Sequence, residues 1–155
     1  MQQPELEKMR QIILLTLLIF VHMSYSQTVN PDISETIIAL EKAALERWNQ
    51  GDPSGYLELS AGDVTYFDPS LEQRLDGLDR LREYYRPIEG LVNVSGYEMV
   101  NPEVTATQNM AVLTFNLHSF TAGNVSKWNC TEVYRLEPDG QWKIVHTHWS
   151  SFIKP

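Results

Sequence analysis

His146 and His148 are the residues whose spacing points most directly to metal chemistry. Side chains at positions i and i+2 of a strand share one face, so two imidazoles there could bind the same ion. A catalytic zinc site needs a third protein ligand, commonly another histidine or a glutamate. His118 and Cys130 are the other obvious donors. We expect instead that the two histidines make hydrogen bonds at a subunit interface, and that the chain binds no metal.

Other sequence signals of cofactor or nucleophile chemistry are missing. The sequence has no glycine-rich phosphate loop, P-loop, Ser-His-Asp signature or metalloprotease helix motif. Its 12 Lys+Arg and 20 Asp+Glu give a formal net charge of −8, which disfavours binding to nucleic acid or to an anionic membrane. The single cysteine excludes an internal disulfide framework and is most simply a small buried hydrophobic residue.

Aromatic side chains give the strongest indication of a ligand. The chain has 4 Trp, 7 Tyr and 5 Phe, and all but Phe20 and Tyr25 follow residue 27. So many rings in one small domain favour an apolar pocket with hydroxyl and indole groups for a flat or cyclic molecule. An ordinary aromatic core is the alternative.

The first 26 residues have the pattern of a secretory signal peptide. Lys8 and Arg10 precede an apolar run over 12–21, and Ser24-Tyr25-Ser26 follows it. The run is shorter than the roughly 20 residues that a membrane span needs. We expect cleavage after Ser26, which leaves one domain of residues 27–155 in a secreted or periplasmic location, free of the membrane. An uncleaved N-terminal anchor is the alternative.

Helical patterns come first in this domain. Residues 32–50 repeat apolar side chains at spacings of three and four, begin with the capping box Asp32/Glu35 and end before Gly51. Shorter helices are expected over 53–60 and 77–86, with a strand over 64–67 between them.

The second half is rich in β-branched and aromatic residues. Strands are expected over residues 92–100, 103–107, 110–120, 126–136 and 142–149, separated by turn signals. Helices followed by an antiparallel meander predict an α+β fold with helices on one face of the sheet. Residues 110–115 show no clean alternation, and Trp142 and Trp149 should point to opposite sides. An apolar second face needs a cover, so we expect a homodimer packed through the sheet. Scattered exposed apolar residues are the alternative.

The run TEVYRLEPDGQWKIVHTHWS, residues 131–150, resembles the closing hairpin of the SnoaL-like branch of the nuclear transport factor 2-like superfamily. It also resembles the end of the association domain of calcium/calmodulin-dependent kinase. WNQGD at 48–52, VTYFDP at 64–69 and Gly77 agree with this resemblance. The resemblance covers about residues 33–152. It implies a cone-shaped fold, in which three N-terminal helices pack on a curved, mainly antiparallel sheet that encloses a cavity.

The resemblance also assigns faces to side chains. Positions that usually face the family's cavity are occupied here by Asp68, Glu132, Val145, Thr147 and Trp149. Strand alternation adds Tyr66, Trp128 and Tyr134, and Tyr56 completes the expected ligand-binding set. The opposite, convex face should then carry Trp142, Ile144, His146 and His148.

Asp68 and Glu132 match the two acids of the ketosteroid isomerase relatives. There an Asp before Pro moves the proton, and a second acid donates a hydrogen bond to the forming oxyanion. Desolvation raises the pKa of a carboxyl in an apolar cavity, which allows proton exchange near neutral pH. Ala44 stands where those isomerases have a tyrosine, which argues against ketosteroid isomerase activity itself. Alternatively, Asp68 caps a turn and Glu132 pairs with Arg135 or Lys143.

These patterns predict an exported protein that binds a small hydrophobic or cyclic ligand. It would act as a cofactor-independent isomerase, cyclase or hydrolase-type enzyme, with Asp68 and Glu132 as catalytic residues. The alternative is a non-catalytic dimeric assembly or interaction module like the kinase association domain.

Overall fold

The computed structural model describes residues 31–152, so the predicted leader lies outside the described residues. The three α-helices precede the four long strands, and this succession of helices before a strand meander is the one that the sequence predicts. The elements in chain order are α2 (Pro31–Asn49), α3 (Ser54–Leu59), β1 (Ser60–Phe67), β2 (Leu75–Asp76), α4 (Leu78–Tyr85), the 3-10 helix η1 (Arg86–Ile88), β3 (Gly96–Ala106), β4 (Met110–Thr121), β5 (Asn124–Leu136) and β6 (Trp142–Ser151). Within 31–152, no helix is both long enough and apolar enough to cross a membrane.

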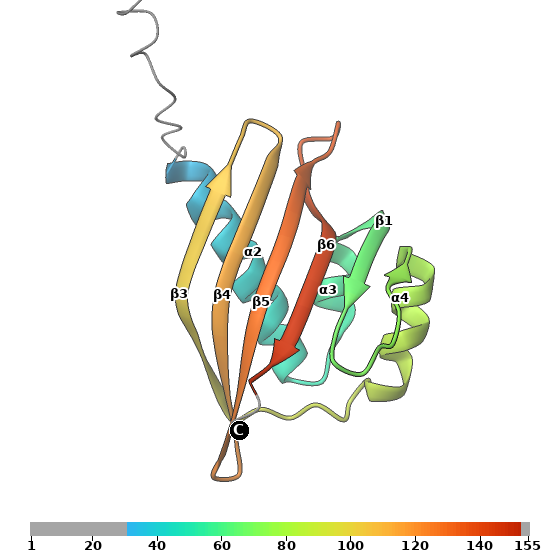
Figure 1. The fold of residues 1–155 in the computed structure, drawn as a ribbon, viewed down its shortest axis with the longest axis vertical. Coiled ribbons are helices and arrows are strands. Elements are labelled where there is room, and N and C mark those ends of the chain that lie inside the picture. Colours follow the sequence, from blue (N-terminus) through green and yellow to red (C-terminus); the bar gives the residue numbers. More distant parts are fainter. Residues whose placement is uncertain (1–30, 153–155) are drawn as a thin grey trace, which may run out of the picture.

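The six strands form one sheet in the order β2-β1-β6-β5-β4-β3. The strands β3 to β6 are an antiparallel meander, and β1 joins β6 in parallel. Figure 1 shows α2 and α3 against one face of this sheet, with α4 beside β1. The predicted α+β class is confirmed, and the arrangement is that of the cone-shaped fold.

Alternation along β4 decides which face is the core. Ala111, Leu113 and Phe115 are buried, whereas Val112 and Thr114 between them are exposed. The sequence shows no clean alternation here because Val112 is apolar and yet points away from the helices. The side chains of β4 therefore alternate between the two faces of the sheet as in a regular strand, and only one of these faces is covered.

One strand replaces two predicted ones. Residues 92–100 and 103–107 were expected as separate strands with a turn at Asn101-Pro102, but β3 runs unbroken from Gly96 to Ala106. The register shifts between Val100 and Glu103, and Asn101 adopts a φ of 49°. A proline has no N–H for the ladder, and a β-bulge lets the strand pass it without ending.

A second irregularity overturns part of the predicted face assignment. Val133 lies opposite His146 and Tyr134 lies opposite Ile144, so Val145 is an extra residue in β6. The extra residue reverses the face on which the β6 side chains preceding Val145 lie, relative to strict alternation. The prediction that Ile144 and Trp142 lie on the convex face is wrong: Ile144 is 1% exposed in the core, and Trp142 packs against that core. His146 lies beyond the bulge, and its side chain stays on the opposite face.

Candidate functional site

A pocket of about 490 Å³ opens between the end of α2, the sheet and the segment that follows η1. That volume lies within the range of small-molecule sites. Five of the sequence-predicted site residues line it: Tyr56, Tyr66, Asp68, Trp128 and Trp149. The other four, Glu132, Tyr134, Val145 and Thr147, are not among its lining residues.

Aromatic rings from α2, α3, α4 and β1 form one wall of the pocket. Trp48 packs edge-on against Tyr85 with ring centroids 5.0 Å apart, and against Tyr56 at 5.8 Å. Tyr85 in turn meets Tyr66 at 5.7 Å, nearly perpendicular to it. Edge-to-face packing of this kind fixes each ring by its neighbours. The wall is therefore apolar and its shape is set before any ligand enters.

Asp68 is the one charged side chain among the pocket's lining residues in the described part of the chain. Its Oδ2 accepts hydrogen bonds from the Tyr84 hydroxyl at 2.7 Å and the Tyr66 hydroxyl at 3.2 Å. Its Oδ1 accepts a hydrogen bond from the Ser70 backbone N–H at 2.7 Å. This bond caps the turn that the sequence predicts as the alternative, structural role of Asp68. Asp68 is thus both a turn residue and a fixed carboxyl group on the pocket wall.

The tyrosines that hold Asp68 remain hydroxyl donors at physiological pH. Burial and the hydrogen bond to Asp68 raise the pKa of Tyr84 to about 12. Burial raises the pKa of Tyr66 well above its ordinary value, and the electrostatic interaction with the neighbouring Tyr85 raises it further. Neither phenol loses its proton near neutral pH, so the carboxyl group keeps both donors.

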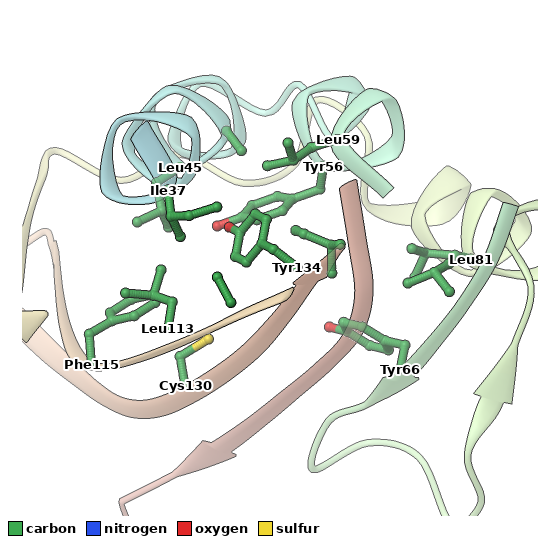
Figure 2. Close-up of a cluster of buried hydrophobic side chains, with 14 of the residues drawn as sticks. Ile37, Leu45, Tyr56, Leu59, Tyr66, Leu81, Leu113, Phe115, Cys130 and Tyr134 are labelled. Carbon is green, nitrogen blue, oxygen red and sulfur yellow. The ribbon is translucent and has the colours of Figure 1, made fainter. Parts of the chain in front are cut away.

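Glu132 lies in a second polar cluster that is sealed from solvent. Glu132 and Glu41 of α2 are both 0% exposed. The Tyr134 hydroxyl lies 2.6 Å from Glu132 Oε2 and 3.0 Å from Glu41 Oε2, and the Tyr56 hydroxyl donates to Glu41 Oε1 at 2.7 Å. Thr147 Oγ1 donates to Glu132 Oε1 at 3.3 Å. Figure 2 shows the hydroxyl oxygens of Tyr56 and Tyr134 close together beneath α2.

The hydrogen-bond geometry has room for one proton between these two carboxyl groups. The Tyr134 hydroxyl has one hydrogen and two carboxyl neighbours, so one of those carboxyls must itself donate. Burial, and then the charge of Glu41, raise the pKa of Glu132 well above its ordinary value. A protonated Glu132 can donate to Tyr134, which donates to Glu41. This arrangement is compatible with one proton held between the two carboxyl groups.

The structure does not bring the two predicted acids together in one site. Asp68 lines the pocket, whereas Glu132 is fully buried and is not among the lining residues. Of the other predicted residues, Tyr134 and Thr147 serve the buried acid pair, and Val145 is the bulged residue of β6.

Glu41 was missed in the sequence, although a signal was present. It stands four residues after Ile37 and four before Leu45, both of which are buried on the same side of α2. A glutamate in the middle of an apolar helix stripe must find partners inside the core, because an unpaired buried carboxyl is costly.

The two histidines also find a partner in the fold. The Thr65 hydroxyl lies 2.7 Å from His146 Nδ1, and the Phe67 ring lies 5.6 Å from the His148 ring. Across residues 31–152, no group of three or more His, Cys, Asp or Glu side chains is arranged to hold a metal ion.

Comparison with known proteins gives a family and a set of solved relatives. Residues 42–145 match the SnoaL-like domain family. A protein of Parabacteroides distasonis proposed to be a ketosteroid isomerase is 51% identical, with a TM-score of 0.72 over 84% of this chain and 95% of that one. A nuclear transport factor 2-like superfamily protein of Salmonella enterica is 20% identical, with a TM-score of 0.64 over 81% and 95% of the two chains.

A more distant neighbour is the hub of the S. rosetta calcium/calmodulin-dependent kinase CaMKII. It is 18% identical, with a TM-score of 0.61 over 76% of this chain and 95% of that one. At such identities the hub and the Salmonella protein share the fold alone. The comparison with curated proteins found no match.

Proposed function

Because the chain belongs to the SnoaL-like domain family of the nuclear transport factor 2-like superfamily, we propose that it binds a small, neutral, largely apolar cyclic molecule in the pocket beside Asp68. Asp68 then moves a proton on that molecule. The observation that carries this proposal is a single fixed carboxyl group in a pocket whose other lining side chains are all uncharged.

The charge of the pocket supports a neutral ligand. None of its lining residues is Lys, Arg or His, so the described part of the chain offers no cation to an anionic ligand there. A phosphate or carboxylate would instead meet the Asp68 carboxyl group, and charge repulsion would disfavour its binding. Flat apolar surfaces can stack against Trp48, Trp128 and Trp149.

The chemistry that suits this wall is proton transfer next to a carbonyl group. Asp68 would take a proton from the carbon beside the carbonyl, leaving an enolate, and would return that proton to the same or a neighbouring carbon. Tyr66 and Tyr84 hold the carboxyl group in one orientation throughout. A reaction of this type balances with no cofactor. It is also compatible with the activity proposed for the P. distasonis relative.

The experiment follows exchange of the α-protons of 2-tetralone, a small cyclic ketone, for deuterium by NMR. The wild type should accelerate the exchange over buffer, and Asp68→Asn should lower that acceleration by about 10²–10⁴-fold, the usual contribution of a positioned acid or base. Asp79→Asn, an exposed change on α4, is the matched control and should behave like the wild type. Equal exchange rates with the wild type and Asp68→Asn would show that Asp68 is a turn residue only.

Two further expectations belong to the same proposal. The convex face carries exposed apolar side chains at Val112, Phe120 and Val125, and a second copy packed there would cover them. The N-terminal pattern supports export to a secreted or periplasmic location. If two copies pair through this face and no small molecule binds the pocket, the assembly-module alternative takes the place of the enzyme.

A further inference from the structure

Asn49, the last residue of α2, has a side-chain donor with no partner in the protein. The residue is 8% exposed and belongs to the pocket wall. Among the fully buried side-chain nitrogen and oxygen atoms of residues 31–152, its Nδ2 is the one without a hydrogen bond. Buried amide groups are almost always hydrogen-bonded in folded proteins, so an exception calls for a reason.

Folding alone gives no reason for an amide at this position. The backbone carbonyl of Asn49 accepts the Val94 N–H at 3.1 Å, and any residue could supply that bond. The side chain packs among pocket residues, where leucine has nearly the same size and would leave no polar atom unpaired. Keeping an unpaired donor in such a place lowers stability, which is typical of positions retained for binding.

The other polar side chains of the pocket differ from Asn49 in their exposure. Ser70, Asn93 and Ser126 are exposed, and Ser119 and Thr121 are partly so, which leaves them solvated near the opening. Apart from the buried tyrosines, Asn49 is therefore the one buried, uncharged polar side chain among the lining residues of the described chain. Rotation about χ2 can present either end of the amide group to the pocket.

We propose that the Asn49 amide is a ligand-binding group that donates a hydrogen bond to a carbonyl oxygen of the bound molecule. The inference rests on the proposed function and narrows its ligand class to neutral ketones that carry apolar rings. The ligand places its carbonyl oxygen at Asn49 and its apolar rings against the tryptophans. A donor at the carbonyl oxygen also stabilises the negative charge that forms there when Asp68 removes the neighbouring proton.

The test compares two probes of nearly the same shape, 2-acetylnaphthalene and 2-isopropenylnaphthalene. The second probe has a C=CH₂ group in place of the C=O group of the first. Dissociation constants are measured by calorimetry for the wild type, Asn49→Leu and Gln50→Leu. Gln50 is the adjacent residue, is exposed and lies outside the pocket, so its variant is the matched control. Thermal unfolding of the three proteins is recorded in parallel.

The wild type and Gln50→Leu should bind the ketone at least about 10-fold more tightly than the hydrocarbon, and Asn49→Leu should lose this preference while still binding the hydrocarbon. Asn49→Leu should also unfold at an equal or higher temperature than the wild type, since it removes an unpaired polar group. An unchanged ketone preference in Asn49→Leu, or a lower Tm with hydrocarbon binding lost as well, would show a structural role and overturn this inference alone. If the wild type binds neither probe, the proposed function fails and the inference fails with it.

Discussion

Replacing Glu132 with glutamine should change how the stability of the protein depends on pH. Glutamine has the size of a protonated glutamic acid, and its amide can donate to the Tyr134 hydroxyl, which lies 2.6 Å from Glu132 Oε2, as a protonated Glu132 would. If the buried pair of Glu41 and Glu132 carries one shared proton, the variant keeps the geometry of the cluster and loses only the group that titrates.

The direction of the pKa shift determines whether the unfolding free energy rises or falls with pH. The pKa of Glu132 is raised well above 4.5 in the folded protein, because burial and Glu41 disfavour its charged form. Above pH 4.5 the folded state therefore holds a proton that the unfolded chain has released, and the stability from this group falls as the pH rises toward the folded pKa. Each pH unit in that window costs the wild type about 1.4 kcal/mol of unfolding free energy.

Urea unfolding at pH 5.5 and pH 6.5 measures this difference. Over that unit, Glu132→Gln should gain about 1.4 kcal/mol of unfolding free energy relative to the wild type. Glu46→Gln, an exposed change on the same helix, is the control and should follow the wild type. If the stabilities of Glu132→Gln and the wild type change in parallel between the two pH values, the shared proton does not exist and the hydrogen-bond assignment of the cluster is wrong.

Two further substitutions and one measurement on the natural protein have defined outcomes. Tyr134→Phe removes the hydroxyl that joins the two buried acids and should lower the unfolding free energy by about 1–3 kcal/mol in urea titrations, whereas an unchanged stability would mean that the bridge contributes nothing. Val125→Asp, on the exposed apolar part of the convex face, should convert a dimer to a monomer in light scattering, and a wild type that is monomeric at high concentration contradicts the proposed pairing. Protein isolated from its own host should begin at Gln27 by N-terminal sequencing, and an N-terminus at Met1 or Met9 on soluble protein would refute cleavage.

The sequence was sufficient to predict the fold class and the succession of helices and strands, because its long helix has a strong periodic pattern and its late strands are rich in β-branched and aromatic residues between turn signals. It was insufficient at two bulges. Nothing in the run around Val145 marks an extra residue, and one such residue reverses the face of Ile144. At Asn101-Pro102 the turn signal is real, but the neighbouring strand β4 continues past it and tertiary pairing keeps β3 intact.

The site was predictable where it depended on strand alternation near a recognisable motif. Tyr66 and Asp68, two residues apart on β1 and its end, do reach the same pocket. The place of Glu132 could not be read in this way, because alternation gives the face of a side chain and not its distance from the opening. Glu132 and Glu41 of α2 both contact the Tyr134 hydroxyl, and this link joins residues that lie 91 positions apart in the chain.

The central claim, that a cyclic apolar molecule occupies the pocket beside Asp68, is tested most directly by the NMR signals of the tryptophan indole N–H groups. The chain has four tryptophans: Trp48, Trp128 and Trp149 line the pocket, and Trp142 lies in a separate groove beside α2. Titration with 2-acetylnaphthalene should shift the first three signals with one common dissociation constant and leave that of Trp142 in place. Four unshifted signals, or a shift of Trp142 alone, would contradict the account.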